Sequence, residues 1–204
     1  MPFTRGLVIA ALALLAPAAS AAQGYRTLDV ATPANDADSV QVTEFFWYGC
    51  PHCYRFEPYV ERWLKDQPAD VEFRRMPAAL SPEWALHGRA FYAAQVLGVL
   101  DQFHQPMFKA MHEQGQRMRS AEAIGEFAAS LGLDGDAFVD TMNSFAVDSR
   151  MRRAKKLQKD YGVSGTPAVV IDGRYLTSGS MAGNFERMMD IIEARVAAVR
   201  RDGG

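Results

Sequence analysis

The chain contains two cysteines, Cys50 and Cys53, which stand three positions apart with Pro51 and His52 between them. A disulfide between them would close a loop of about four residues. In the chain-entropy model such a loop stabilises a folded protein by only about 2 kcal/mol, whereas a loop of about a hundred residues contributes about 4.7 kcal/mol. A purely structural cross-link is therefore a poor use of this pair.

Other chemistries are open to a Cys-x-x-Cys pair. Tetrahedral zinc needs four ligands, and the chain offers only two thiols. A c-type haem needs histidine directly after the second cysteine, where this chain has Tyr54. Copper(I) binds paired thiolates, but no Met-x-x-Met motif or further histidine cluster accompanies the pair. The residues favour thiol–disulfide redox chemistry without a metal or cofactor. If the protein is not an enzyme, the alternative is a holdase or a copper-binding protein.

The surroundings of Cys50 predict how its sulfur is tuned. Gly49 and Cys50 follow a predicted strand and precede an amphipathic run, which places Cys50 at a helix amino terminus. Unpaired amides and the helix dipole favour an anion there. Pro51 suits the first turn because it has no amide proton, and His52, if cationic or donating toward the sulfur, stabilises the thiolate further. A stabilised thiolate favours the reduced form, so the disulfide should be a strong oxidant. Cys53, one turn inward and better buried, should be the resolving thiol.

Hydrophobic patterns predict the elements that position these cysteines. Residues 40–47 are rich in β-branched and aromatic side chains, and the end of this run does not alternate, which predicts a strand buried on both faces. Apolar residues then recur at spacings of three and four as far as about Lys65, as in a helix. A second strand, 71–76, ends at Pro77. This strand–helix–strand unit predicts a parallel pair with a right-handed crossover.

The rest of the chain predicts a helical block and then a return to mixed structure. Capping residues mark three helix starts in the block, at Ser81, Ser120 and Asp134. After it we predict a helix at 146–161, strands at 168–171 and 174–177 joined by a turn at 172–173, and a helix at 184–200. The domain organisation expected is therefore a first α/β part in residues 22–77, an inserted helical domain in 78–145 and a second α/β part in 146–204.

Residues 1–21 have the pattern of a bacterial Sec signal peptide. Arg5 supplies a positive charge, an apolar run follows at 7–15, and Ala19-Ser20-Ala21 fits the small-x-small cleavage pattern. The apolar run is shorter than the roughly 20 residues that a membrane span requires. We therefore expect cleavage after about Ala21 and export to the periplasm, an oxidising compartment in which cysteine pairs form and persist.

Composition excludes several classes of protein. Hydrophobic residues make up 49% of the chain and charged residues 23%, which is typical of a folded globular domain and not of a disordered one. The formal net charge is −2, whereas a nucleic-acid binder needs a clear basic excess. His87, His104 and His112 lack ligand spacing, so no role is assigned to them. The basic run from Arg150 to Lys159 is interpreted as the solvated face of its helix.

Three features together resemble one known family. They are the block Phe45-Phe46-x-x-x-Cys50-Pro51-His52-Cys53-Tyr54-x-Phe56-Glu57, the helical insertion, and Gly165-Thr166-Pro167 before a strand. The chain is similar in these features to the DsbA family of bacterial periplasmic thiol–disulfide oxidoreductases, over essentially its whole mature length. The resemblance implies a thioredoxin fold, an α/β fold with a central mixed β-sheet flanked by helices, into which an all-helical domain is inserted.

The resemblance also implies roles for particular residues. Cys50 would form mixed disulfides with newly exported proteins and Cys53 would release them. Pro167 matches the family's cis-proline, and the backbone of Thr166 would pair with an extended client segment. Glu44 and Glu57 match two acids near the active site that tune pKa values and move protons; a further match is Arg75, at the place of a basic partner. The best-known member has valine where this chain has Thr166, so the hydroxyl is expected to alter redox potential and client release.

The partners implied are unfolded or newly exported proteins with cysteines, and a DsbB-like quinone-coupled membrane oxidase that restores the disulfide. Within the same fold, a disulfide isomerase or reductase is the nearest alternative activity. Isomerases of this fold also have a threonine at the position of Thr166. Isomerases of this fold carry an extra dimerisation domain, and no segment here is free to form one. A monomeric oxidase is therefore the expected function.

Overall fold

The computed structural model describes residues 23–29 and 39–202. The predicted signal peptide at 1–21 lies outside the described residues, as does a linker-like stretch at 31–38. The described strands and helices are, in chain order, β1 (Tyr25–Thr27), β2 (Val40–Phe46), α2 (Pro51–Leu64), β3 (Val71–Pro77), α3 (Pro82–Val96), α4 (Leu100–His112), α5 (Ala121–Ser130), α6 (Gly135–Met142), α7 (Phe145–Asp160), β4 (Ala168–Ile171), β5 (Tyr175–Ser178), α8 (Gly179–Ala182) and α9 (Phe185–Asp202). Across these ranges, none of the helices combines the length and apolar character needed to cross a bilayer.

The strands form one mixed sheet in the order β1-β5-β4-β2-β3. β2 and β3 are parallel, as the strand–helix–strand pattern predicts, and the remaining pairs are antiparallel. The register places Glu44 of β2 beside Arg75 of β3 on one side and beside Val169 of β4 on the other. The central strand β2 therefore carries an ionisable side chain into the middle of the sheet, just ahead of the cysteines.

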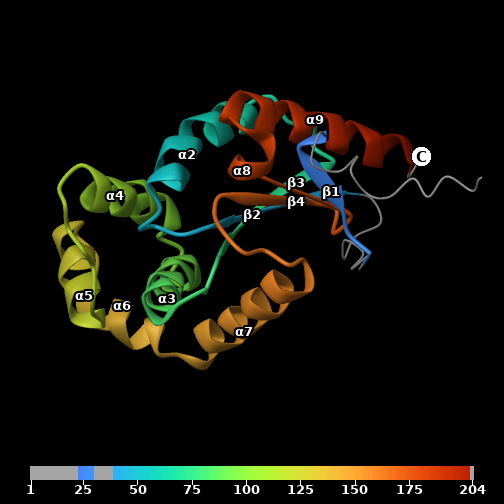
Figure 1. Cartoon of the computed structure of the whole chain (residues 1–204). Coiled ribbons are helices and arrows are strands. Elements are labelled where there is room, and N and C mark those ends of the chain that lie inside the picture. Colours follow the sequence, from blue (N-terminus) through green and yellow to red (C-terminus); the bar gives the residue numbers. More distant parts are fainter. Residues whose placement is uncertain (1–22, 30–38, 203–204) are drawn as a thin grey trace, which may run out of the picture.

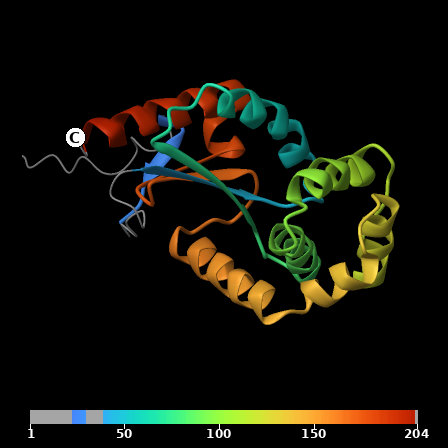
Figure 2. The same cartoon turned by 180° about the vertical axis from the view of Figure 1, so that it is seen from behind.

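Helices cover both faces of the sheet (Figure 1). On one face, α2 and α9 pack over Val40 and Val42 of β2. On the other face, Phe45 packs against Tyr161, at the end of α7. Figure 2, from behind, shows α3 to α6 gathered beyond one end of the sheet, where β2 runs out. Both faces of β2 are thus buried, as its unalternating sequence predicts.

The helical block starts its helices where the capping residues predict. The side chains of Ser81, Ser120 and Asp134 each accept a hydrogen bond from the backbone N–H three residues later. Phe46 enters the core of this block, where its ring meets Tyr48, Phe91 and His104 edge-on. The end of β2 and the helical block therefore share one apolar core, and the cysteines follow directly from that junction.

Two short elements, β1 and α8, were not predicted from the sequence. Strand β1 has only three residues and pairs with β5, and α8 is a single turn directly after β5. Both are too short to show a hydrophobic period, which is the signal that predicts longer elements. The predicted turn between β4 and β5 is present, with Asp172 and Gly173 both at positive φ, as a two-residue hairpin turn requires.

Candidate active site

Cys50 caps the amino terminus of α2, as the sequence predicts. Its backbone is extended, with φ −87° and ψ 114°, and Pro51 occupies the first turn of the helix. Cys53 lies one turn later. Both are free thiols, Cys50 at 7% exposure and Cys53 at 0%. The helix therefore offers the first sulfur to reaction partners and keeps the second inside.

The surroundings lower the pKa of Cys50 from about 9 to about 5. The largest cause is a hydrogen bond from the Cys53 thiol; burial acts against it, while donors on Thr166, Cys53 and His52 add to it. The contributions from Cys53 and His52 include their backbone N–H groups, which are unpaired at a helix start. At neutral pH Cys50 is therefore predominantly a thiolate.

Cys53 shifts in the opposite direction. Burial raises its pKa well above the usual value, and the hydrogen bond to Cys50 and the charges of Cys50 and Glu44 raise it further. One sulfur of the pair is thus stable as an anion and the other is stable as a thiol. This asymmetry matches the predicted division into an attacking and a resolving cysteine.

A segment from far along the chain completes the site. The turn before β4 holds Thr166 and Pro167 joined by a cis peptide bond, and the Cys50 sulfur lies 3.4 Å from the Thr166 carbonyl oxygen. The Thr166 hydroxyl is buried and makes no hydrogen bond with any described residue. It is a donor beside the two sulfurs, and it lowers the pKa of both Cys50 and Cys53. The structure thus brings together the cysteines, Thr166 and Pro167.

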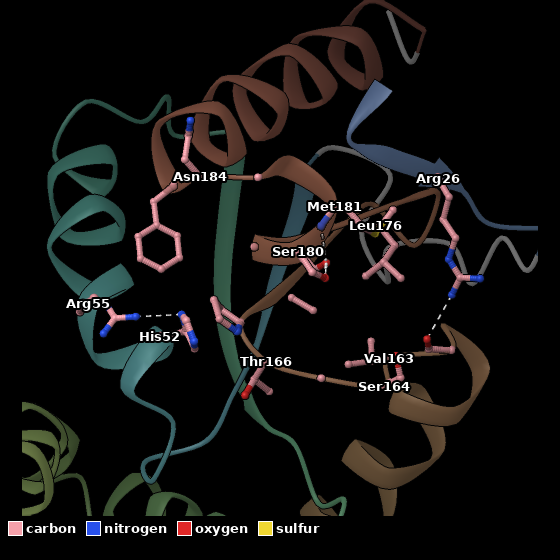
Figure 3. Close-up of a pocket in the computed structure, with 18 of the residues that line it drawn as sticks. Arg26, His52, Arg55, Val163, Ser164, Thr166, Leu176, Ser180, Met181 and Asn184 are labelled. Carbon is pink, nitrogen blue, oxygen red and sulfur yellow. Dashed lines mark hydrogen bonds between the residues drawn. The ribbon is translucent and has the colours of Figure 1, made fainter. Parts of the chain in front are cut away.

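The His52 side chain makes no hydrogen bond with the Cys50 sulfur in the part of the chain that the structure describes. Its Nδ1 accepts a hydrogen bond of 2.9 Å from Arg55, one turn along α2, as Figure 3 shows. The contribution of His52 to the Cys50 thiolate therefore comes from its backbone N–H. The expected stabilisation by the imidazole itself remains a prediction.

A groove of about 830 Å³ opens beside helix α2 and the turn before β4, and we call it the cis-proline groove (Figure 3). Its lining combines charged side chains, such as Arg55 and Glu186, with apolar ones, such as Leu176 and Phe185. The groove is lined by residues of α2, of the turn before β4 and of α8 and α9: Arg26, His52, Arg55, 162–168, Leu176, Ser178–Met181 and Gly183–Glu186. An extended segment in it would lie alongside the Thr166 backbone.

Behind the cysteines lies a buried charge cluster made of Glu44, Glu57 and Arg75. The Arg75 guanidinium donates to both oxygens of Glu57, at 3.3 and 2.8 Å, and its Nε lies 3.6 Å from Glu44. Burial alone would raise the pKa of Glu57, but a contact with His104 and the charge of Arg75 lower it below the usual range. Glu57 is therefore the ionised partner of Arg75.

Glu44 behaves differently from its neighbour. It is fully buried, and neither oxygen has a hydrogen-bond partner among the described residues. Burial, helped by the negative charge of Glu57 and opposed by Arg75, raises its pKa to about 8. At neutral pH Glu44 holds a proton, close enough to Cys53 to influence its titration. The resemblance pointed to both acids, and the structure gives them different protonation states.

Two residues beside this cluster, His104 and Tyr48, were not predicted to belong to the site. The His104 Nδ1 lies 2.8 Å from the Tyr48 hydroxyl, and its Nε2 faces Glu57 at 3.5 Å. Burial keeps His104 neutral by lowering its pKa, and raises the pKa of Tyr48. The signal available in the sequence was the spacing of His104, Phe108 and His112, which recur every four residues and so share one face of α4.

The described residues contain no group of three or more His, Cys, Asp or Glu side chains arranged to hold a metal ion. The cluster behind the cysteines is instead neutralised by Arg75 and by the proton on Glu44. The site therefore presents two thiols, a proton-bearing acid and a groove for a chain segment.

Comparison with known sequences gives a consistent set of relatives. A family described as "DSBA-like thioredoxin domain" matches residues 41–190. A "Thiol:disulfide interchange protein DsbA" from Bordetella parapertussis is 39% identical, and the match covers 98% of each chain. A protein of the same name from Azotobacter vinelandii is 38% identical over 83% of this chain and 79% of its own length.

Solved structures give the same result. The crystal structure of Pseudomonas aeruginosa DsbA superposes with a TM-score of 0.79 at 37% identity, covering 86% of this chain and 94% of that one. The oxidoreductase DsbA from Xylella fastidiosa superposes with a TM-score of 0.81 at 31% identity, covering 87% and 96%. The similarity therefore includes both the sheet and the helical block.

Proposed function

The chain belongs to the DsbA family and is a thiol:disulfide oxidoreductase with a thioredoxin fold, and we propose that it donates a Cys50–Cys53 disulfide to other proteins. The observation that carries this proposal is the opposite tuning of the two sulfurs, with the pKa of Cys50 lowered to about 5 and that of Cys53 raised. A dithiol that is stable as one thiolate and one thiol favours the reduced form. Its disulfide is correspondingly oxidising.

The reaction begins when a client thiolate attacks the Cys50 sulfur of the oxidised protein. A bond forms between the client sulfur and Cys50, and the Cys50–Cys53 bond breaks with its electron pair on Cys53. A second client thiolate then attacks the client sulfur of this mixed disulfide and displaces Cys50. The client has lost two electrons and now has a disulfide. The protein has gained those electrons, and its disulfide has been reduced to two separate cysteines. Cys50 leaves readily because its thiolate is stable.

Glu44 is proposed to donate a proton to Cys53 during this exchange. Cys53 must take up a proton after its bond to Cys50 breaks, because burial disfavours its thiolate. Glu44 is buried nearby and holds a proton at neutral pH, so it can supply it. Arg75 and Glu57 set the balance of charge around Glu44, since the guanidinium lowers its pKa and the second carboxylate raises it.

The cis-proline groove is proposed to hold the client segment. The position of Thr166 beside Cys50 supports this, because an extended backbone that pairs with Thr166 would bring a client cysteine to the Cys50 sulfur. The clients proposed are newly exported, incompletely folded proteins with cysteines. A quinone-coupled membrane oxidase is proposed to restore the disulfide, and the predicted signal peptide supports a periplasmic location.

The test is an oxidation assay with a dithiol peptide. Oxidised wild-type protein should oxidise it, whereas Cys50→Ala and Cys53→Ala, neither of which can form the internal disulfide, should not. Equal rates for Cys50→Ala and wild type would overturn the proposal. The equilibrium with glutathione separates an oxidase from a reductase, because a reductase would hold its disulfide more tightly. Recovery of active ribonuclease from its scrambled form would identify an isomerase instead.

A further inference from the structure

A second groove lies beside Cys50. This groove, of about 440 Å³, includes Gly49 and Pro51, the two residues that flank Cys50, whereas the cis-proline groove includes His52. We call it the arginine groove, and it is lined by Trp47, Gly49, Pro51, Glu83, Met111, His112, Gly115, Gln116, Arg117 and Arg119. A segment bound to Cys50 can therefore have neighbours in both grooves.

One wall of the arginine groove is held rigidly. The Trp47 ring stacks on Trp84, with centroids 4.4 Å apart and planes at 11°. Its Nε1 donates to His87 Nδ1 at 2.9 Å, and His87 Nε2 lies 3.0 Å from the Met118 carbonyl oxygen. Since Nδ1 accepts, Nε2 carries the proton and donates to that carbonyl. A chain of hydrogen bonds thus ties the indole to the loop that forms the opposite wall.

That loop presents two arginines. Met118 is 4% exposed and has φ +46°, a left-handed conformation that is uncommon for a residue other than glycine. Arg117 and Arg119, on either side of this buried anchor, are exposed and line the groove. Neither guanidinium has a hydrogen bond or ion pair with another described residue. The one carboxylate lining the groove is Glu83, so positive charge is in excess there.

We propose that the arginine groove is a second client subsite, which prefers an acidic side chain in the client segment beyond the cysteine that reacts with Cys50. Guanidinium groups match carboxylates in shape and hydrogen bonding, and Trp47 and Met111 offer apolar contact to the rest of the side chain. This proposal rests on the proposed function, because it assumes that client cysteines react at Cys50. It adds a charge preference in a groove separate from the cis-proline groove.

The test uses the full chain as Cys53→Ala, with a coloured aromatic thiol attached to Cys50 by a disulfide. Peptides with one cysteine and Glu, Gln or Lys two positions before or after it displace the coloured thiol. Each rate is divided by that peptide's rate with the free aromatic disulfide, which removes the effect of the charge on peptide reactivity. The Glu peptide should react about threefold to tenfold faster than the Lys peptide in one of the two placements.

Variants assign that preference to the arginines. Arg117→Gln with Arg119→Gln should bring the Glu-to-Lys ratio close to one, and the double change to Glu should invert it. The matched control is Arg152→Glu with Arg153→Glu, the same change of charge on the exposed face of α7. The proposal is overturned if all peptides react at one rate, or if the control removes the preference equally. Failure of every peptide to react would instead contradict the proposed function.

Discussion

The sulfur of Cys50 lies 3.4 Å from the carbonyl oxygen of Thr166, although 116 residues separate the two in the chain. Thr166 presents two groups to the cysteines. Its carbonyl accepts from the thiol form of Cys50, whereas its hydroxyl has no hydrogen-bond partner among the described residues, is available to donate to a thiolate, and lowers the pKa of Cys50. The residue proposed to pair with a client backbone therefore also tunes the Cys50 sulfur, so a change of its side chain should change the redox potential directly.

Thr166→Val should make the protein a weaker oxidant. The change removes the hydroxyl that favours both thiolates, at nearly constant volume. A hydrogen bond to a charged group contributes about 1.5–3 kcal/mol, so the equilibrium constant with glutathione should fall by about tenfold or more. The pKa of Cys50, followed by the ultraviolet absorbance of its thiolate, should rise. Thr166→Ser keeps the donor and should stay close to wild type. Identical titrations of the Val and Ser variants would contradict this role.

The stability of the reduced protein should depend on pH. The pKa of Cys50 is about 5 in the folded state and near its usual value of about 8.5 when unfolded. A lowered folded pKa contributes stability that is complete above the unfolded pKa and is lost as the pH falls through about 5. The oxidised protein has no such thiol. The free energy of unfolding of the reduced form, minus that of the oxidised form, should therefore rise from pH 5 to 8. Denaturant titrations of both forms measure it, and a constant difference would contradict the prediction.

The sequence predicted the parts of this site that depend on local pattern. The patterns of neighbouring residues predict a strand over 40–47, a helix after Cys50 and a hydroxyl cap at Ser81. The structure has all three, with the strand ending one residue earlier, at Phe46. The contribution of Thr166 and Pro167 depended on resemblance. Nothing local to these two residues indicates that they lie against a cysteine more than a hundred residues away.

The contacts within and around the buried charge cluster depend on packing between distant elements. Glu44 and Arg75 become neighbours through the parallel register of β2 and β3, which the sequence does not specify. His104 reaches Tyr48 and Glu57 only because α4 packs against α2, across the junction of sheet and helical block. A histidine without ligand spacing gives no sign of such contacts. Its placement follows from tertiary structure alone.

Glu44→Gln should stabilise the oxidised protein at pH 8 and have little effect at pH 4. The folded pKa of Glu44 is about 8, above the unfolded value of about 4.3, so wild type loses stability as the pH rises between the two. A neutral amide avoids this loss, and the gain at pH 8 should be of the order of 2 kcal/mol. Unfolding by urea at both pH values measures it.

Glu57→Gln is the matched control for that experiment, because it removes a carboxylate whose pKa is lowered. Its loss leaves the buried Arg75 without its closest partner. The Glu57 variant should therefore lose stability at pH 8, opposite in sign to the Glu44 variant. If both variants change stability in the same direction at pH 8, the two acids do not have the different protonation states described above.

Gly49→Ala should destabilise the fold by about 2 kcal/mol. A Cβ at position 49 would lie against the Trp47 ring, closer than van der Waals contact allows, so the indole must shift from its stack on Trp84 and its hydrogen bond to His87. Gly165→Ala is the control, since a Cβ there meets nothing within 4 Å. Urea unfolding midpoints should fall for the first variant and hardly move for the second. A Gly49→Ala protein as stable as wild type would show that the indole has free space, which would also weaken its role as a fixed wall of the arginine groove.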